Sequence, residues 1–139
     1  MFTAVALGDI WSELFREKLR EADNGNPEAQ YDVGTMYQNG RGVEPDRDKA
    51  IVWFERAAAQ GDAKAISRLK LMQANAARFD KTAVAAAGGD SESQYELGNM
   101  YLKGIGTNIN PTKAISAFEQ AARHGHIKAT YKLGLMYYD

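Results

Sequence analysis

The sequence repeats itself, and this repetition constrains the fold more than any other feature. A phrase of Leu or Val, Gly, any residue, Met and Tyr occurs at 33–37, 97–101 and 133–137, with a degraded copy at 69–73. The methionines of the four copies are separated by 36, 28 and 36 residues, and columns of glycine and alanine keep the same offsets. Repeats of this length are typical of helical arrays, in which each unit buries its apolar face against its neighbours.

Each full repeat predicts two helices. In the first, small and apolar residues recur every three or four positions from Ala29 to Tyr37, which places them on one face of an α-helix. A pair of glycines then ends that helix, because glycine accepts the left-handed conformation found at helix ends. Asp46 and Asn110 occupy equivalent positions before the second helix and are predicted N-caps, and Pro111 suits the first helical position.

The second repeat is eight residues shorter than the others and lacks the glycine pair. The chain passes from Gln73 directly into Ala76, so we expect a tighter turn between two helices there. The repeats predict an all-α fold, a right-handed α-solenoid of about eight helices. Its expected parts are an N-terminal capping helix at 1–24, repeat one at 25–60, a shortened repeat two at 61–88, repeat three at 89–124 and half of a fourth repeat at 125–139.

Composition excludes several classes of function. The chain of 139 residues has a formal net charge of -1 and no cysteine. It therefore lacks the basic field that non-specific nucleic-acid binding needs, and it can form no disulfide. The N-terminus has no basic flank and no apolar run reaches the length of a membrane span, so we expect neither a signal peptide nor membrane insertion. The expected chain is soluble, cytoplasmic by default, or periplasmic if the sequence has been trimmed.

The repeat also matches a longer pattern. Residues 29–61 fit A-x-x-x-[LV]-G-x-M-Y-x-x-G-x-G-x-x-x-[DN]-x-x-K-A-x-x-x-F-x-x-A-A-x-x-G, and residues 93–125 fit it with serine for the first alanine. This pattern closely resembles the Sel-one-like repeat, a relative of the tetratricopeptide repeat. The departures are the short second repeat, Lys70 in place of glycine, Ala117 in place of an aromatic residue, and the incomplete fourth copy. The resemblance implies an adaptor that assembles protein complexes, in bacterial envelope or secretion processes for example, with no catalytic residue and no cofactor.

The resemblance also implies where a protein or peptide partner would bind. In tetratricopeptide arrays the first helix of each repeat lines the concave surface, which receives extended segments or helices. The residues expected on that surface are Glu28, Tyr31, Thr35, Gln38, Lys64, Ser67, Glu92, Tyr95, Asn99, Lys103, Lys128 and Tyr131. The three tyrosines are equivalent in register, and two interpretations stay open: a binding stripe along the groove, or packing between neighbouring helices.

Other motifs have ordinary structural interpretations. His124 and His126 form a pair, but no cysteine or third histidine exists, so a solvated turn is favoured over a metal site. The repeat methionines are expected in the core. The glycine pairs follow helices rather than strands, which disfavours phosphate binding, and no catalytic motif is found, so we expect no enzyme.

The incomplete fourth repeat supports an alternative function. Its single helix would leave Leu133, Leu135, Met136 and Tyr137 partly uncovered. Either the array continues beyond Asp139 or another molecule covers this end. A self-associating module that forms a homodimer through residues 126–139 is therefore the alternative to an adaptor, since a two-fold dimer is the commonest way to cover such a patch.

Overall fold

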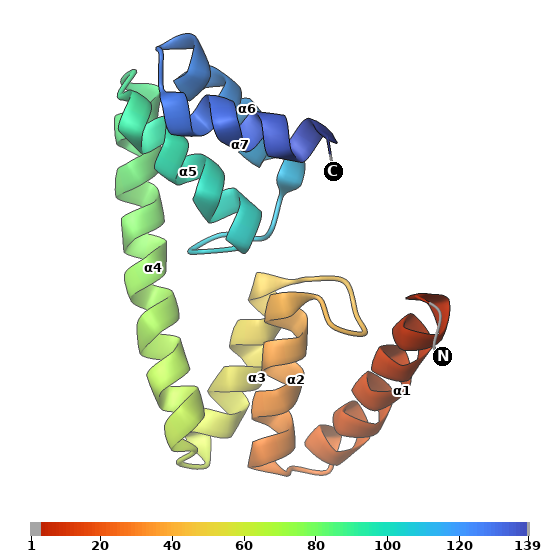
Figure 1. Cartoon of the computed structure of the whole chain (residues 1–139). Coiled ribbons are helices and arrows are strands. Elements are labelled where there is room, and N and C mark those ends of the chain that lie inside the picture. Colours follow the sequence, from red (N-terminus) through yellow and green to blue (C-terminus); the bar gives the residue numbers. More distant parts are fainter. Residues whose placement is uncertain (1–3, 139) are drawn as a thin grey trace. The chain divides into compact units, whose positions relative to one another are not determined.

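The computed structural model describes the backbone of residues 4–138 and the side chains of residues 8–138. This part of the chain forms seven α-helices and no strand (Figure 1). The helices are α1 (Ala4–Asp23), α2 (Pro27–Asn39), α3 (Arg47–Ala59), α4 (Ala63–Ala87), α5 (Ser91–Lys103), α6 (Pro111–Arg123) and α7 (Ile127–Tyr138). The predicted all-α fold of helical repeats is confirmed, with seven helices where about eight were expected. None of the described helices is long and apolar enough to cross a bilayer. Residues 1–3 and 139, which belong to the predicted capping helix and half repeat, lie outside the described residues.

The helices form two compact units, Met1–Leu71 and Met72–Asp139, called here the first and second units. In the first unit α2 packs against both α1 and α3. In the second unit α6 packs against both α5 and α7. The boundary between the units falls inside α4, so this helix contributes its first turns to one unit and its last turns to the other.

The second helix of each full repeat begins where the sequence predicts. Asp46 accepts a hydrogen bond from the backbone N–H of Lys49 at 3.0 Å, and Asn110 accepts one from Lys113 at 3.0 Å. Pro111 is the first residue of α6. Both predicted N-caps are confirmed, because each side chain satisfies a backbone donor that has no partner within its own helix.

The first helix of each full repeat ends on the first glycine of the predicted pair. Gly40 and Gly104 adopt left-handed conformations, with φ of 68° and 71°. Their backbone N–H groups donate to the carbonyl oxygens of Met36 and Met100. A residue with a Cβ is disfavoured in this conformation, which explains why glycine stands at the same place in both repeats.

One phenylalanine of each full repeat is completely buried against a glycine. Phe54 in α3 and Phe118 in α6 are fully buried, and each ring lies directly over a helical glycine, Gly34 or Gly98. The missing side chain lets the facing helix approach the ring closely, as dense packing requires. The predicted core position of the repeat methionines is confirmed, with Met36, Met72 and Met100 buried and Met136 half-buried.

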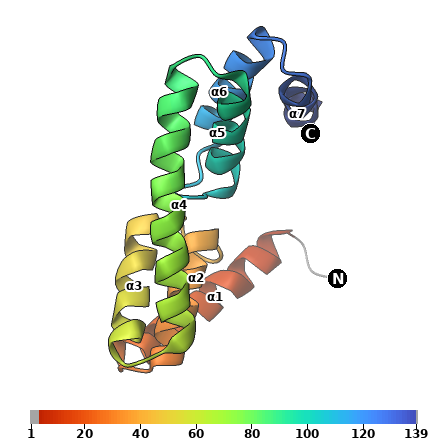
Figure 2. The ribbon, with the colours of Figure 1, turned by 90° about the vertical axis from the view of Figure 1, so that its left-hand side faces the viewer.

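The predicted turn inside the shortened repeat is wrong. Residues 63–87 form one helix of 25 residues, visible as a single unbroken ribbon in Figure 2. The segment from Gln73 to Phe79 contains no glycine or proline and four of its seven residues are alanine or arginine, which are strong helix formers. With no residue to stop the first helix, the shortened repeat continues it directly into the second.

The loop after the first helix is held against the preceding helix in both units. A Cβ on Gly42 would collide with the carbonyl oxygen of Trp11 in α1, and a Cβ on Gly106 would collide with that of Asn75 in α4. Gly106 lies 64 positions after Gly42, and Asn75 lies 64 positions after Trp11. The same offset separates Met36 from Met100. The C-terminal half of α4 therefore serves the second unit as α1 serves the first.

Candidate functional site

Three of the predicted partner-binding residues line one pocket of the first unit. Tyr31, from α2, lies beside Lys64 and Ser67, from the first turns of α4, around a volume of about 410 Å³. We call this space the α4 pocket; its lining is Tyr31, Ala63, Lys64, Ser67, Arg68 and Leu71. Because α2 and α4 are both first helices of their repeats, the pocket lies on the face that the resemblance to tetratricopeptide arrays indicates.

Arg68 is a residue of this pocket that the sequence analysis missed. Its guanidinium donates to Gln38 Oε1 at 2.6 Å and to the hydroxyl oxygen of Tyr31 at 3.0 Å. The guanidinium carbon also lies 5.6 Å from the centre of the Tyr31 ring, within the range of a cation–π contact. Tyr31 in turn packs on Phe54 with ring centres 5.5 Å apart. Tyr31 therefore packs between helices and lines the pocket at the same time.

Thr35 lies in a different pocket of the first unit, of about 240 Å³, between α1 and α2. Its hydroxyl donates to the carbonyl oxygen of Asp32 at 2.8 Å. The Asp32 carboxylate also pairs with Lys18 at 3.4 Å, and this hydrogen bond is the main reason why the pKa of Lys18 is raised above 10.5. Glu28 is exposed and lines neither pocket of this unit.

Four predicted residues of the second unit come together in one pocket, also of about 240 Å³. We call it the α5 pocket; its lining is Arg78, Glu92, Tyr95, Glu96, Asn99, Met100, Lys103 and Ile105. The α5 pocket and the pocket of Thr35 occupy equivalent places in the two units, since six pairs of lining residues are 64 positions apart. The mixed charges of the α5 pocket include one tight pair, Arg78 with Glu96, whose closest atoms are 2.5 Å apart.

Asn99 has an unsatisfied oxygen in the α5 pocket. Among the buried side-chain nitrogen and oxygen atoms that the structure describes, Asn99 Oδ1 is the one without a hydrogen-bond partner. A buried carbonyl oxygen without a donor costs about 1–3 kcal/mol relative to a satisfied one. The surrounding protein covers this oxygen, so the cost falls on the folded chain itself.

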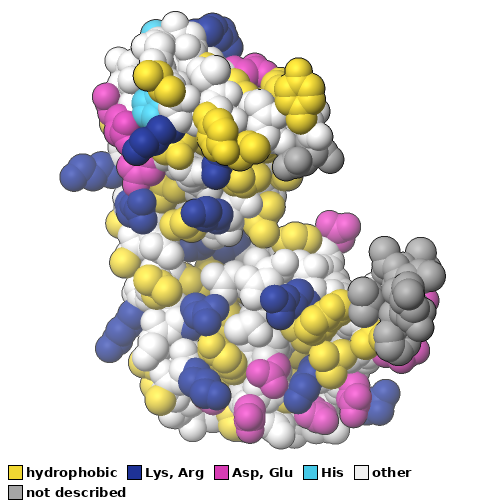
Figure 3. All heavy atoms as spheres, in the orientation of Figure 1, with side chains coloured by type: hydrophobic (Ala, Val, Ile, Leu, Met, Phe, Trp, Pro, Cys, Tyr) yellow, Lys and Arg dark blue, Asp and Glu magenta, His cyan; other side chains and the backbone are white. Residues whose placement is uncertain are grey.

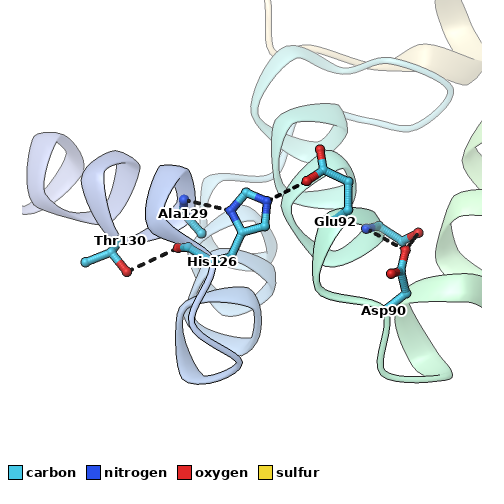
Figure 4. Close-up of polar contacts among 6 residues, drawn as sticks. Asp90, Glu92, His126, Ala129 and Thr130 are labelled. Carbon is cyan, nitrogen blue, oxygen red and sulfur yellow. Dashed lines mark hydrogen bonds and ion pairs between the residues drawn. The ribbon is translucent and has the colours of Figure 1, made fainter.

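The structure corrects the interpretation of His126 as part of a solvated turn. Its side chain is only 10% exposed, and Nε2 lies 2.7 Å from Glu92 Oε2 (Figure 4). Nδ1 accepts the backbone N–H of Ala129 at 3.2 Å, which assigns the ring proton to Nε2. The imidazole also stacks on Tyr95, with ring centres 4.6 Å apart. His126 thus fixes the start of α7 against α5.

His126 occupies a position that recurs as a helix N-cap in every repeat. Asn26, Asp62 and Asp90 hold the positions equivalent to His126, and each accepts a backbone N–H near the start of a first helix. Hydrogen bonds from the hydroxyl and backbone N–H of Ser93 lower the pKa of Asp90 below 3.8. His126 is the fourth member of this series of N-caps, at the same sequence offsets of 36, 28 and 36 residues as the repeat methionines.

Two buried glutamines tie neighbouring helix pairs together. Gln30 Nε2 donates to the carbonyl oxygen of Ala22 at 3.1 Å, and Gln94 Nε2 donates to that of Ala86 at 3.1 Å. The amide oxygen of Gln94 contacts His124 Nδ1 at 3.0 Å, so His124 also has a structural partner. Each glutamine adds a second donor to a carbonyl group at the end of the preceding helix, which also accepts the backbone N–H of Gly25 or Gly89.

The remaining predicted residues, Lys128 and Tyr131, are exposed on α7. Tyr131 is 68% exposed, whereas its register equivalents Tyr31 and Tyr95 are half-buried, so the three tyrosines do not share one environment. On the face of the second unit where α7 lies, hydrophobic and basic side chains gather side by side (Figure 3). The hydroxyl of Tyr137 donates to Glu119 at 2.8 Å, and this bond raises the pKa of Tyr137 above 10.0.

Within residues 8–138, no three His, Asp or Glu side chains gather closely enough to hold a metal ion. The groups with shifted pKa values are Lys18, Asp90 and Tyr137, and the largest cause of each shift is a hydrogen bond to one neighbour, Asp32, Ser93 or Glu119.

Comparison with known proteins agrees with the architecture. The sequence pattern of the Sel1 repeat matches residues 27–62, 91–126 and 127–139. A mouse protein (Mus musculus), DAP3-binding cell death enhancer 1, is 30% identical over 177 aligned residues that cover 96% of this chain and 34% of the mouse protein. The yeast chitin synthase regulator SKT5 (Saccharomyces cerevisiae) is 34% identical over 70 residues, or 50% of this chain and 10% of the yeast protein. The crystal structure of a Sel1 repeat protein from Oxalobacter formigenes is 32% identical, with a TM-score of 0.43, over 86% of this chain and 96% of that one.

In the described part of the chain, consecutive helices follow one another in register, with capped loops between them and surface pockets on the first helices of the repeats. This arrangement defines a helical-repeat protein. The family pattern covers more than half of the residues. The chain belongs to the Sel1 repeat family. It spans about a third of the length of the mouse relative and a tenth of the yeast relative.

Proposed function

We propose that the chain is a non-catalytic scaffold that holds a segment of a partner protein against the first helices of its repeats. The observation that carries the proposal is the α5 pocket, which is lined by four predicted residues, Glu92, Tyr95, Asn99 and Lys103. An extended segment presents both main-chain polar groups and side chains, which suits a pocket where the exposed charges of Glu92 and Lys103 lie beside the Tyr95 ring.

The relatives support the same class of function. The mouse relative is named for binding another protein, and the yeast relative is named as a regulator of an enzyme. Both descriptions fit proteins that act through contact with a partner. Both names describe proteins that are much longer than this chain.

Site-specific photocrosslinking tests the proposal. A benzophenone amino acid would replace Ser67 in the α4 pocket or Lys103 in the α5 pocket, and Glu55, exposed on α3, would serve as the control position. We expect the same partner protein to be crosslinked from a pocket position and not from position 55. Equal crosslinking from all three positions, or none from either pocket, would contradict the proposed face.

Self-association through α7 is a second candidate, favoured by the exposure of its apolar side chains. Ile127 is 84% exposed, Tyr131 68% and Tyr138 93%. Light scattering over a concentration series should then show a dimer in the wild type and a monomer in Tyr131→Ser. A wild-type chain that stays monomeric at high micromolar concentration would remove this candidate.

A further inference from the structure

The α4 pocket carries two positive charges that no carboxylate neutralises. Among the side chains of residues 8–138, neither Lys64 nor Arg68 forms an ion pair, and the polar partners of Arg68 are the neutral groups of Gln38 and Tyr31. Arg78 differs, because it is paired with Glu96. The hydrogen bonds hold the Arg68 guanidinium in place while leaving its charge available to a ligand.

The stretch of α4 that carries both cations contains no acidic residue. From Ala63 to Phe79, α4 contains Lys64, Arg68, Lys70 and Arg78 and neither Asp nor Glu. The carboxylate of Asp62, directly before the helix, accepts the backbone N–H of Ala65. An exposed cation gains little from a distant carboxylate in water, so a ligand must bring its own carboxylate into the pocket to benefit.

Apolar surface lies next to these charges. Leu71, part of the pocket lining, is 55% exposed, and Ile66 on the same helix is 38% exposed. The Tyr31 ring adds an aromatic wall, with Lys64 Nζ 5.9 Å and the guanidinium carbon of Arg68 5.6 Å from its centre. A ligand that fits this surface carries a carboxylate close to an apolar side chain.

From these observations we infer that the α4 pocket binds an acidic peptide segment, in which Glu or Asp pairs with Arg68 and Lys64 while a neighbouring apolar residue packs on Leu71. The inference rests on the proposed scaffold function and specifies the chemistry of the partner. The second unit repeats the same residue types 64 positions later, as Tyr95, Lys128, Lys132 and Leu135, and α7 likewise contains no Asp or Glu between Ile127 and Tyr138. A partner with two acidic stretches could therefore engage one stretch on each unit.

Fluorescence anisotropy with the full chain tests this inference. The probe is a labelled peptide of about twelve residues that alternates pairs of Glu and Leu, long enough to cross one or two helices; the matched probe has Gln in place of every Glu. We expect the Glu peptide to bind at least about tenfold more tightly than the Gln peptide, because only the former forms charge-assisted hydrogen bonds. Arg68→Gln and Lys64→Gln should each weaken the Glu peptide severalfold.

The control variants distinguish binding at the α4 pocket from non-specific attraction between an acidic peptide and any basic residue of the helix. Lys70→Gln removes an equal charge from the same helix outside the pocket and should leave affinity within about twofold. Lys64 is exposed, so its variant keeps the test valid even if Arg68→Gln disturbs folding. Equal binding of both peptides, or an equal loss in Lys70→Gln, would overturn the inference. So would binding to vesicles rich in phosphatidylserine without binding to either peptide. A partner crosslinked at Ser67 with no preference for the Glu peptide would refute the acidic chemistry alone and leave the scaffold function standing.

Discussion

Gly34 faces the ring of Phe54 so closely that a Cβ on the glycine would lie 2.5 Å from Cε1 of the ring. Gly98 and Phe118 repeat this relationship at the same distance of 2.5 Å. Both rings are fully buried and cannot swing away. The glycine of the repeated phrase is therefore required by the aromatic residue of the following helix, and the two positions depend on each other.

Gly34→Ala should destabilise the chain by about 1–3 kcal/mol, since the new methyl group overpacks a rigid core. The matched control is Gly134→Ala, at the equivalent position of α7, where a Cβ would meet no atom within 4 Å. Alanine is the better helix former, so this control should be neutral or more stable by up to about 1 kcal/mol. Urea denaturation measures both changes, and similar effects in the two variants would refute the packing argument.

Gln94→Leu should cost about 0.5–1.5 kcal/mol, because the buried hydrogen bond to the carbonyl oxygen of Ala86 is lost while the backbone N–H of Gly89 still donates to that oxygen. Gln73→Leu on the exposed side of α4 is the comparison, with an expected change within about 0.5 kcal/mol. Thermal and chemical unfolding of the two variants provide the values. Equal stability of Gln94→Leu and the wild type would mean that the interhelical bond is dispensable.

Tyr95 and Tyr131, which are equivalent in register, should differ in how much each contributes to the stability of the fold. Tyr95→Ala removes a ring packed on Phe118 and on His126 and should cost about 1–3 kcal/mol. Tyr131→Ala, at a site 68% exposed, should change stability by less than about 0.5 kcal/mol. Circular dichroism melting curves distinguish them. A large loss for Tyr131→Ala would show that its ring is covered in solution, as a dimer would require.

Asp90 should contribute stability that depends on pH. Its pKa in the folded chain is lowered below 3.8 by the hydrogen bonds from Ser93, so the contribution is complete above that value and is lost as the pH falls through the folded pKa. The stability difference between the wild type and Asp90→Ala should therefore shrink between neutral pH and about pH 3. Asn26→Ala removes an N-cap that does not titrate, and its difference should stay constant. Parallel behaviour of the two variants would contradict the assignment.

Ala77→Pro tests whether α4 is continuous. Proline inside a helix removes a backbone donor and clashes with the preceding turn, so we expect a loss of about 3 kcal/mol or more. Ala77→Gly should cost about 1 kcal/mol at the same exposed position. Denaturant titrations of both variants measure the two free energies of unfolding. A proline that is tolerated as well as the glycine would indicate a turn at this place.

Sequence patterns predicted the structural features that recur at the same position of each repeat. They did not predict the contacts made by long side chains such as Arg68, nor the continuous helix of the shortened repeat. Local chemistry repeated at fixed offsets was enough to predict the glycine pairs, the N-caps at Asp46 and Asn110 and the buried methionines. The turn expected after Gln73 was wrong because the hairpin of the neighbouring repeats was assumed to persist without residues that stop a helix. The alanines and Arg78 of that segment already favoured helix.

The candidate site was predicted in outline only. Tyr31, Lys64 and Ser67 were placed by register and do share a pocket, but Arg68 reaches it through a flexible side chain whose partner lies 37 positions away in the sequence. No periodicity encodes such a contact. His126 could have been recognised, because its register equivalents Asn26, Asp62 and Asp90 are typical N-cap residues.

Leu71 and Met72, where the two compact units meet, lie in the middle of α4. Domains are usually joined by exposed, flexible segments, and these are the segments that proteases cut. Here the peptide bonds at the junction are held by helical hydrogen bonds on both sides, whereas Glu44 and Pro45 are exposed in a loop. Limited digestion should therefore begin in the loops and spare the junction, so that the two units are not released as separate folded fragments.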